Sequence, residues 1–203
     1  MGKSRTPSLY LRLADNCLAR FSSILQSGFR LKTEGGLSIE TLLTQEYGVQ
    51  PETLDKIQTV FLDGKAVDDL KSSVVREGSI LALSAAMPGL VGATLRRGSY
   101  YAAMRSPITA TGTRVGAEHK AVTITLKLFN LLLDELGPIF LKSGILIERG
   151  VLQAFLSRLP PKFWINCKEA RINGRKVEPE AVSKMTWPNA DELICLKAEG
   201  NIP

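Results

Sequence analysis

The sequence of 203 residues predicts an α+β protein with two small mixed β-sheets in tandem, each crossed by one helix. One order of local patterns (strand, strand, helix, strand, turn, strand) occurs twice, about 110 residues apart. In each copy, apolar residues at helical spacing stand between segments with the apolar pattern of strands. A helix packed on a mixed sheet buries one sheet face, which gives about 75 residues a small core.

The first copy is expected to begin with two strands joined by a turn at Ser27-Gly28. Ser38 is a suitable N-cap for the following helix, and Gly48 a suitable end. Asp63-Gly64 has the composition of a tight hairpin turn. In chain order, we expect strands at 18–26 and 29–33, a helix at 38–48, and strands at 57–62 and 80–83.

The second copy repeats this order and begins with a regular strand pattern. From Ala121 to Phe129, apolar residues alternate with two threonines and a lysine. Pro160-Pro161 ends the predicted helix, and Asn173-Gly174 corresponds to the earlier Asp-Gly turn. In chain order, we expect strands at 121–129 and within 139–147, a helix at 148–159, and strands at 167–172 and 193–196.

The segment between the copies differs from both in composition, which predicts three parts: a first domain at 1–89, a linker at 90–119 and a second domain at 120–203. The linker region is rich in glycine and carries most of the net charge of +6. Residues 90–120 contain five Lys or Arg against one Glu, a net of +4. Two adjacent tyrosines lie between its arginines.

This basic segment is the candidate binding segment of the sequence. Arginines interleaved with tyrosines suit single-stranded nucleic acid, because the charges contact phosphates and the rings stack on bases. The alternative is a linker whose rings pack on a neighbouring domain, which we favour because nucleic-acid binders more often carry positive charge over their folded domains too. The candidate residues are Gly89, Gly92, Arg96, Arg97, Tyr100, Tyr101 and Arg105.

The sequence has few of the residues on which catalysis or metal binding depends. His119 is the only histidine, so a Ser-His-Asp triad or an imidazole-rich metal site would have to use it. The carboxylates at Asp68-Asp69 and Asp134-Glu135 are adjacent in sequence, and these pairs indicate a turn and a solvent-exposed helix rather than a catalytic pair. We therefore expect no enzyme, no catalytic residues, no cofactor and no metal.

The cysteines indicate a reducing compartment. Cys17, Cys167 and Cys195 are an odd number at unrelated spacings, which argues against a disulfide framework. The basic start of the chain has no apolar segment after it, and the most apolar stretch, 126–141, contains charged residues and a proline. We expect a cytoplasmic protein with no membrane partner.

Three short motifs resemble those of a known family. Residues 127–129 (KLF) and 132–137 (LLDELG) are similar to the family's first strand and the short helix after it. Residues 172–177 (INGRKV) are similar to its hairpin, and residues 76–83 (REGSILAL) are similar to the segment that leads into its last strand. Together they resemble the β-grasp, or ubiquitin-like, fold, and within it the small sulfur carriers of molybdopterin and thiamine synthesis. The resemblance covers about residues 18–92 and 120–200 and implies two β-grasp domains in tandem.

Sulfur carriers act through a C-terminal Gly-Gly, whose flexible end threads into a partner and whose carboxylate becomes a thiocarboxylate. The sequence ends Gly200-Asn201-Ile202-Pro203, and the equivalent Pro- and Gly-containing region of the first copy, 86–93, is internal. Carrier chemistry would therefore require cleavage near Gly89 or Gly92, or after Gly200. We expect a non-catalytic protein-interaction module that binds another, unidentified protein; the alternatives are a sulfur carrier or its precursor, and nucleic-acid binding through the basic linker.

Overall fold

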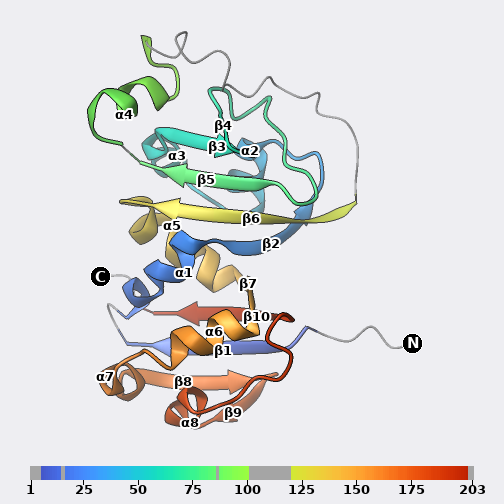
Figure 1. Ribbon diagram of the computed structural model, residues 1–203, viewed down its shortest axis with the longest axis vertical. Helices are drawn as coiled ribbons and strands as arrows, with labels where there is room; N and C mark the ends of the chain where they lie inside the picture. Colours follow the sequence, from blue (N-terminus) through green and yellow to red (C-terminus); the bar gives the residue numbers. More distant parts are fainter. Residues whose placement is uncertain (1–5, 15–16, 86, 101–119, 201–203) are drawn as a thin grey trace. The chain divides into compact units, whose positions relative to one another are not determined.

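The computed structural model describes residues 6–14, 17–85, 87–100 and 120–200. The chain has the α+β composition that the sequence predicts, with helices and a mixed arrangement of strands (Figure 1). It divides into two compact units. Unit 1 comprises residues 1–24 and 138–203, and unit 2 comprises residues 25–137.

The elements of unit 2 are β2 (Phe29–Glu34), α2 (Ile39–Thr41), a π-helical turn (Leu42–Glu46), α3 (Pro51–Lys56), β3 (Thr59–Leu62), β4 (Lys65–Ala66), β5 (Ile80–Ser84), α4 (Gly89–Leu95) and β6 (Ala121–Phe129). The elements of unit 1 are β1 (Ser8–Leu13), a 3-10 turn (Leu18–Phe21), β7 (Ile145–Glu148), α6 (Arg149–Leu156), α7 (Pro161–Ile165), β8 (Cys167–Ile172), β9 (Arg175–Val177), α8 (Pro179–Ser183) and β10 (Leu193–Glu199). Helices α1 (Ser22–Ser27) and α5 (Leu132–Ser143) each contain one boundary between the units.

The strands of the two units are paired in the same pattern of directions. In unit 2 the order is β2-β6-β5-β3-β4, with β6 and β5 parallel and the other pairs antiparallel. In unit 1 the order is β7-β10-β1-β8-β9, with β10 and β1 parallel and the other pairs antiparallel. Each unit thus has a central parallel pair with one antiparallel strand on one side and an antiparallel hairpin on the other.

Each central pair combines strands from both predicted domain ranges, 1–89 and 120–203. Strand β6 opens the predicted second domain, 120–203, but it lies between β2 and β5 in unit 2. Strand β1 belongs to the predicted first domain, 1–89, but it lies between β10 and β8 in unit 1. The compact units therefore divide the chain at different places from the predicted domain ranges, because these two strands pair outside their own predicted ranges.

The start of the chain differs from the prediction. Residues 18–27 are helical, whereas the sequence analysis expected a strand at 18–26. Phe21, Ile24 and Leu25 are buried at helical spacing, and this period explains the error. The sequence analysis also missed β1, although Leu9, Leu11 and Leu13 alternate with exposed or half-buried residues as strand residues do.

Several local features are confirmed. Strands β6 and β8 have the predicted bounds. Ser38 caps α2, since its hydroxyl oxygen accepts a hydrogen bond of 3.0 Å from the amide of Thr41. Both residues of each predicted hairpin turn have positive φ: 52° and 78° for Asp63-Gly64, and 51° and 81° for Asn173-Gly174. Paired positive φ angles are those of the tight turns that suit the twist of a hairpin.

The core of unit 2 lies on one face of its strands. Leu81, Leu83, Leu126 and Leu128 are fully buried and share one face, because Leu81 pairs with Leu126 and Leu83 pairs with Leu128. Residues between them on β5 and β6 point to the opposite face and are partly exposed, apart from the buried Ser84. This second face, which we call the open face, carries the candidate site described below.

Among the described residues, no helix combines the length and apolar character that crossing a membrane requires.

The inward position of β1 predicts a large loss of stability on Leu11→Ala. The Leu11 side chain is fully buried, so its truncation should lower the free energy of unfolding by about 2–5 kcal/mol in urea denaturation. The matched control is Arg12→Ala, next along the same strand: Arg12 is exposed and its ion pair with Glu169 (3.4 Å) should contribute about 1 kcal/mol or less. Equal effects of the two substitutions would contradict the placement of β1.

Candidate functional site

The candidate site lies on the open face of unit 2, where three strands place their outward side chains in rows. Directly paired residues share a sheet face. Phe61 of β3 pairs with Ala82 of β5, and Ala82 pairs with Lys127 of β6. In the next row, Ser84 of β5 pairs with Phe129 of β6. The register therefore brings two phenylalanines, 68 positions apart in sequence, to one side of the sheet.

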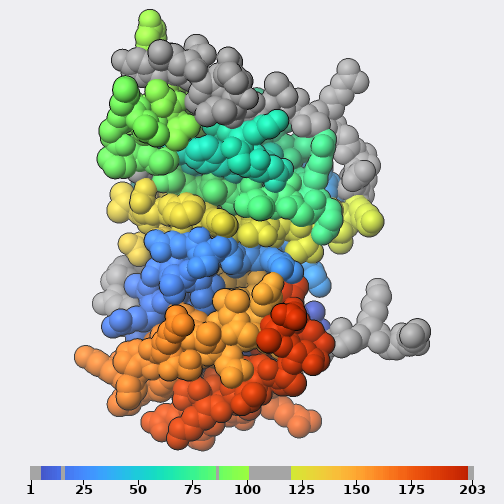
Figure 2. All heavy atoms as spheres, in the orientation of Figure 1, coloured from blue at the N-terminus to red at the C-terminus, as the bar shows by residue number. Residues whose placement is uncertain are grey.

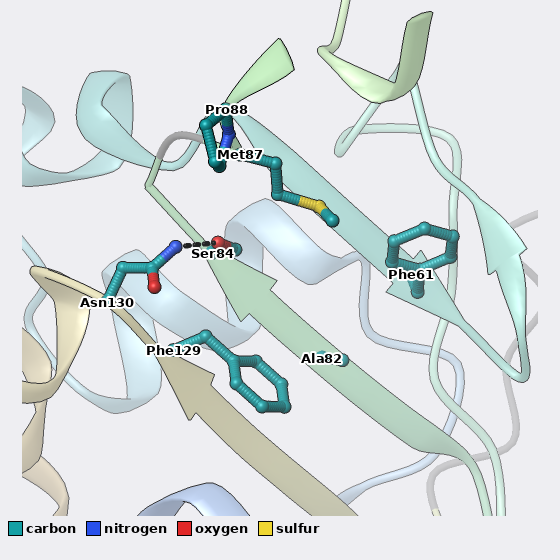
Figure 3. A pocket seen from close by; sticks show the side chains of 7 residues that line it. All are labelled: Phe61, Ala82, Ser84, Met87, Pro88, Phe129 and Asn130. Carbon is teal, nitrogen blue, oxygen red and sulfur yellow. Dashed lines mark hydrogen bonds between the residues drawn. The ribbon is translucent and has the colours of Figure 1, made fainter. Parts of the chain in front are cut away.

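These side chains border an apolar pocket of about 330 Å³. Figure 3 shows Phe61, Ala82 and Phe129 standing on one side of β3, β5 and β6, with helices drawn behind the strands. Met87 and Pro88 close one end of the pocket. The residues that line it are Phe61, Ala82, Ser84, Met87, Pro88, Phe129 and Asn130.

Helix α4 fixes the segment that carries Met87 and Pro88. Pro88 is the N-cap residue of α4, and Gly92, one turn into the helix, is buried against the backbone of Met87. A Cβ atom at Gly92 would lie 1.8 Å from the Met87 carbonyl oxygen, so only glycine permits this packing. The space-filling view shows the atoms of α4 on the outside of unit 2 (Figure 2, green).

The polar atoms at the edge of the pocket bond to each other. The Asn130 side-chain amide donates a hydrogen bond of 2.9 Å to the Ser84 hydroxyl oxygen (Figure 3). Asn130 has a φ of 57°, a left-handed conformation that asparagine tolerates better than most residues. This residue therefore ends β6 with a turn and keeps its amide beside the apolar lining.

Further apolar side chains are exposed on elements that line the pocket or adjoin it in the chain. On α4, next to Pro88, Leu90 is 74% exposed and Val91 is 65% exposed. Ile80 lies on the open face, since it pairs with Thr125, and Leu131 is exposed just after Asn130. Apolar side chains gathered around a hollow are typical of a surface that another molecule covers.

The predicted binding residues lie on α4 and just beyond it. Gly89 and Gly92 are in the helix, Arg96 is its C-cap residue, and Tyr100 is 92% exposed. Tyr101 and Arg105 lie outside the described residues. The segment from 89 to 100 thus borders the apolar pocket through α4.

Arg97 is held by the fold of unit 2. Its Nε–H donates a hydrogen bond of 2.9 Å to the Ile57 carbonyl, and its backbone N–H donates to the Gln58 carbonyl at 2.8 Å. Burial lowers the pKa of the Arg97 guanidinium, against the opposing effect of Asp55 and Asp68. These contacts tie the residues after α4 to the segment that leads into β3, and they occupy Arg97 in a structural role.

The chemistry of the pocket is that of apolar recognition. In the part of the chain that the structure describes, no ionisable side chain lines it, and no three or more His, Cys, Asp or Glu side chains gather in a group that could hold a metal ion. The pocket can hold an apolar side chain, with the Asn130–Ser84 pair offering an amide oxygen and a hydroxyl at its rim. A small set of polar groups beside apolar walls is common in binding sites.

The sequence analysis did not identify Phe61, Ala82 or Phe129 as site residues. One signal was present: in the alternating strand 121–129, Phe129 falls in register with Thr123, Thr125 and Lys127 on the polar side. A single surface aromatic residue is common, so this signal gains meaning only when the structure brings Phe129 beside Phe61 in one apolar patch. Met87 and Pro88 were noted only as part of the resemblance to the carrier end.

Comparison of the chain with models of protein families, with curated proteins and with solved structures finds no match.

The close packing at Gly92 predicts that Gly92→Ala disturbs the pocket. The added methyl would displace α4 from Met87 and lower the free energy of unfolding by about 1–3 kcal/mol, the usual cost of overpacking. Urea denaturation measures this loss, and the NMR signal of the Met87 methyl reports the displacement.

The matched control is Leu90→Ala in the same helix. Leu90 is mostly exposed, so its truncation should change stability by no more than about 0.5 kcal/mol. If Gly92→Ala leaves both the stability and the Met87 signal unchanged, α4 does not pack as described.

Proposed function

We propose that this chain is a non-catalytic protein-interaction module that binds a partner through the apolar pocket on the open face of unit 2. The observation that carries the proposal is the pocket of about 330 Å³ between Phe61, Phe129 and Met87. Its volume suits one or two large apolar side chains, the kind of anchor that dominates the energy of protein interfaces. Burying a single such side chain contributes about 1.5–3 kcal/mol.

The surroundings of the pocket support a macromolecular partner over a small ligand. A small-molecule site buries most of its ligand's surface, whereas this pocket opens on a sheet face. Leu90, Val91 and Ile80 extend the apolar surface beyond the lining residues. An interface needs such a surrounding area to exclude water from its central contacts.

A second hollow, in unit 1, fits this role less well. It has a volume of about 290 Å³ and lies beside α7 and α8. A lysine and a glutamate, Lys184 and Glu180, line it together with Trp164. Its mixed lining lacks the continuous apolar wall of the unit 2 pocket.

We further propose that both units derive from one β-grasp fold, as the resemblance implies. The shared pattern of strand directions supports this, as do the equivalent hairpin turns at Asp63-Gly64 and Asn173-Gly174. The order of the central strands differs between the units: in unit 2, β5 follows the β3–β4 hairpin in the chain and pairs with β3, whereas in unit 1, β10 follows the β8–β9 hairpin but pairs with β7, and β1 pairs with β8. In this proposal, the two central strands of unit 1 have therefore changed places as well as copies. The three cysteines, an odd number at unrelated spacings, support the cytoplasm as the compartment.

The sulfur-carrier alternative has a structural cost. Cleavage near Gly89 or Gly92 would free the carboxyl end that a carrier needs, but both glycines belong to α4, and Gly92 is packed on Met87. Cleavage there would remove the helix that supports one end of the pocket. The packing therefore favours an intact docking surface.

The proposal predicts that Phe61→Ser abolishes partner binding. Affinity purification from the native host with the intact protein should recover a partner in stoichiometric amount, and the purified partner should form a complex of defined ratio with it. Phe61→Ser removes an apolar wall and Ala82→Glu fills the floor with a charge, so both should prevent that complex. Each variant is first checked for an unchanged fold by circular dichroism and thermal melting.

Val151→Ser is the matched control, because Val151 is an exposed apolar residue on α6 of unit 1. It should retain the complex in full. A complex that tolerates Phe61→Ser and Ala82→Glu but is lost with Val151→Ser would place the binding site elsewhere, and the proposal would fail. Recovery of no stoichiometric partner would also count against it.

A further inference from the structure

The charges beside the pocket point to the chemistry of its occupant. We infer that the open face binds a peptide segment whose apolar anchor residues are flanked by aspartate or glutamate. This inference rests on the proposed function, because it names the partner class for the same site.

A group of cations shares the open face with the pocket. Lys127 pairs directly with Ala82 at the pocket floor. On β2, Arg30 pairs with Thr125 and Lys32 pairs with Thr123, so both lie on the same face as Lys127. Arg30 and Lys32 are exposed, and Lys127 is half-buried. Two carboxylates lie near this group: Glu34 is at the end of β2, and Glu77 accepts a hydrogen bond of 2.8 Å from the backbone N–H of Thr123.

Gly28, the residue before β2, leaves room for the Lys127 side chain. A Cβ atom at Gly28 would lie 3.2 and 3.3 Å from the Cε and Cγ atoms of Lys127, so the lysine stem runs closely over this glycine. The half-buried Lys127 therefore runs towards Gly28, and long cationic side chains commonly bury the stem while the charged end stays in water. This contact places the ammonium group on the β2 side of the pocket.

The spacing between the apolar and cationic parts suits a peptide. Strand β2 is two strands away from β5, which is about 10 Å across the sheet. Arg30 and Lys32 are also displaced along the strands by two and four residues from the position of Lys127 and Ala82, so their backbones lie about 12 and 16 Å from the pocket floor. An extended peptide advances about 3.3 Å per residue, so acidic residues about three to five positions from the apolar anchor would face the cations.

A peptide with apolar and acidic residues matches both parts of the open face, the apolar pocket and the group of cations beside it. An apolar side chain gains by leaving water in the pocket, and the carboxylates gain Coulomb energy and orientation from the cations. A nucleic-acid strand would meet the same cations, but the pocket offers it apolar walls with one bonded amide–hydroxyl pair. The lining therefore favours the peptide.

The test uses three fluorescein-labelled nonapeptides and the full chain. The first has the core Leu-Phe-Leu flanked on each side by three acidic residues, the second has the same core flanked by lysines, and the third has Ala-Ala-Ala between acidic flanks. Fluorescence anisotropy measures binding, and ¹⁵N NMR shifts map it. We expect the acidic apolar peptide to bind at least about tenfold more tightly than the other two, with shifts at Phe61, Ala82 and Phe129, and to bind more weakly at higher salt.

Charge-reversal variants test the cations of the open face, with one variant in unit 1 as the control. Lys127→Glu and Lys32→Glu should each weaken binding of the acidic peptide by about fivefold or more, whereas Lys168→Glu, at an exposed position on β8 of unit 1, should leave it unchanged. Equal effects of the three reversals would overturn the inference, because the loss would then reflect net charge alone.

The outcomes separate this inference from the proposed function. If the lysine-flanked peptide binds the pocket as tightly as the acidic one, the acidic partner is wrong and the docking surface stands. If no peptide binds while Phe61→Ser still abolishes the native complex, the inference fails alone. If a single-stranded oligonucleotide shifts Phe61 and Phe129 and no peptide does, both the inference and the proposed function fail.

Discussion

The pairing of β6 between β2 and β5 is the interaction on which the candidate site depends. Strand β6 fills the core with Ile124, Leu126 and Leu128, all fully buried, and presents Lys127 and Phe129 on the opposite face. Without this strand, β5 would expose an unpaired edge and the pocket would lose its Phe129 wall. A strand that follows the predicted linker thus completes both the strand arrangement of unit 2 and the lining of its pocket.

Local sequence patterns predicted those features that depend only on residues close together in the chain. The alternation in 121–129, the N-cap at Ser38 and the two Asx-Gly turns all depend on neighbours in sequence. The pairing partners of the strands could not be predicted in this way. The inward leucines of β6 would suit the sheet of either copy, because alternation defines a buried face but not a neighbouring strand. The choice depends on tertiary packing.

The candidate site was only partly predictable for a related reason. The composition of the basic segment drew attention to α4, and that helix does border the pocket through Gly92 and Met87. The pocket itself joins residues from β3, β5 and β6 that are far apart in sequence, so no short motif contains it. Arg97 was expected from the sequence to take part in binding, but its side chain donates a hydrogen bond to the carbonyl of Ile57 within the fold.

The most direct measurement of the central claim is the NMR detection of contacts between strands in the isotope-labelled full chain. The account predicts nuclear Overhauser effects from β6 to both neighbours: a parallel register that pairs Leu126 with Leu81, and an antiparallel register that pairs Leu126 with Phe29. Contacts from β6 to β7 and β10 in their place would contradict it. The pocket formed by Phe61, Ala82 and Phe129 would then not exist, and the docking surface with it.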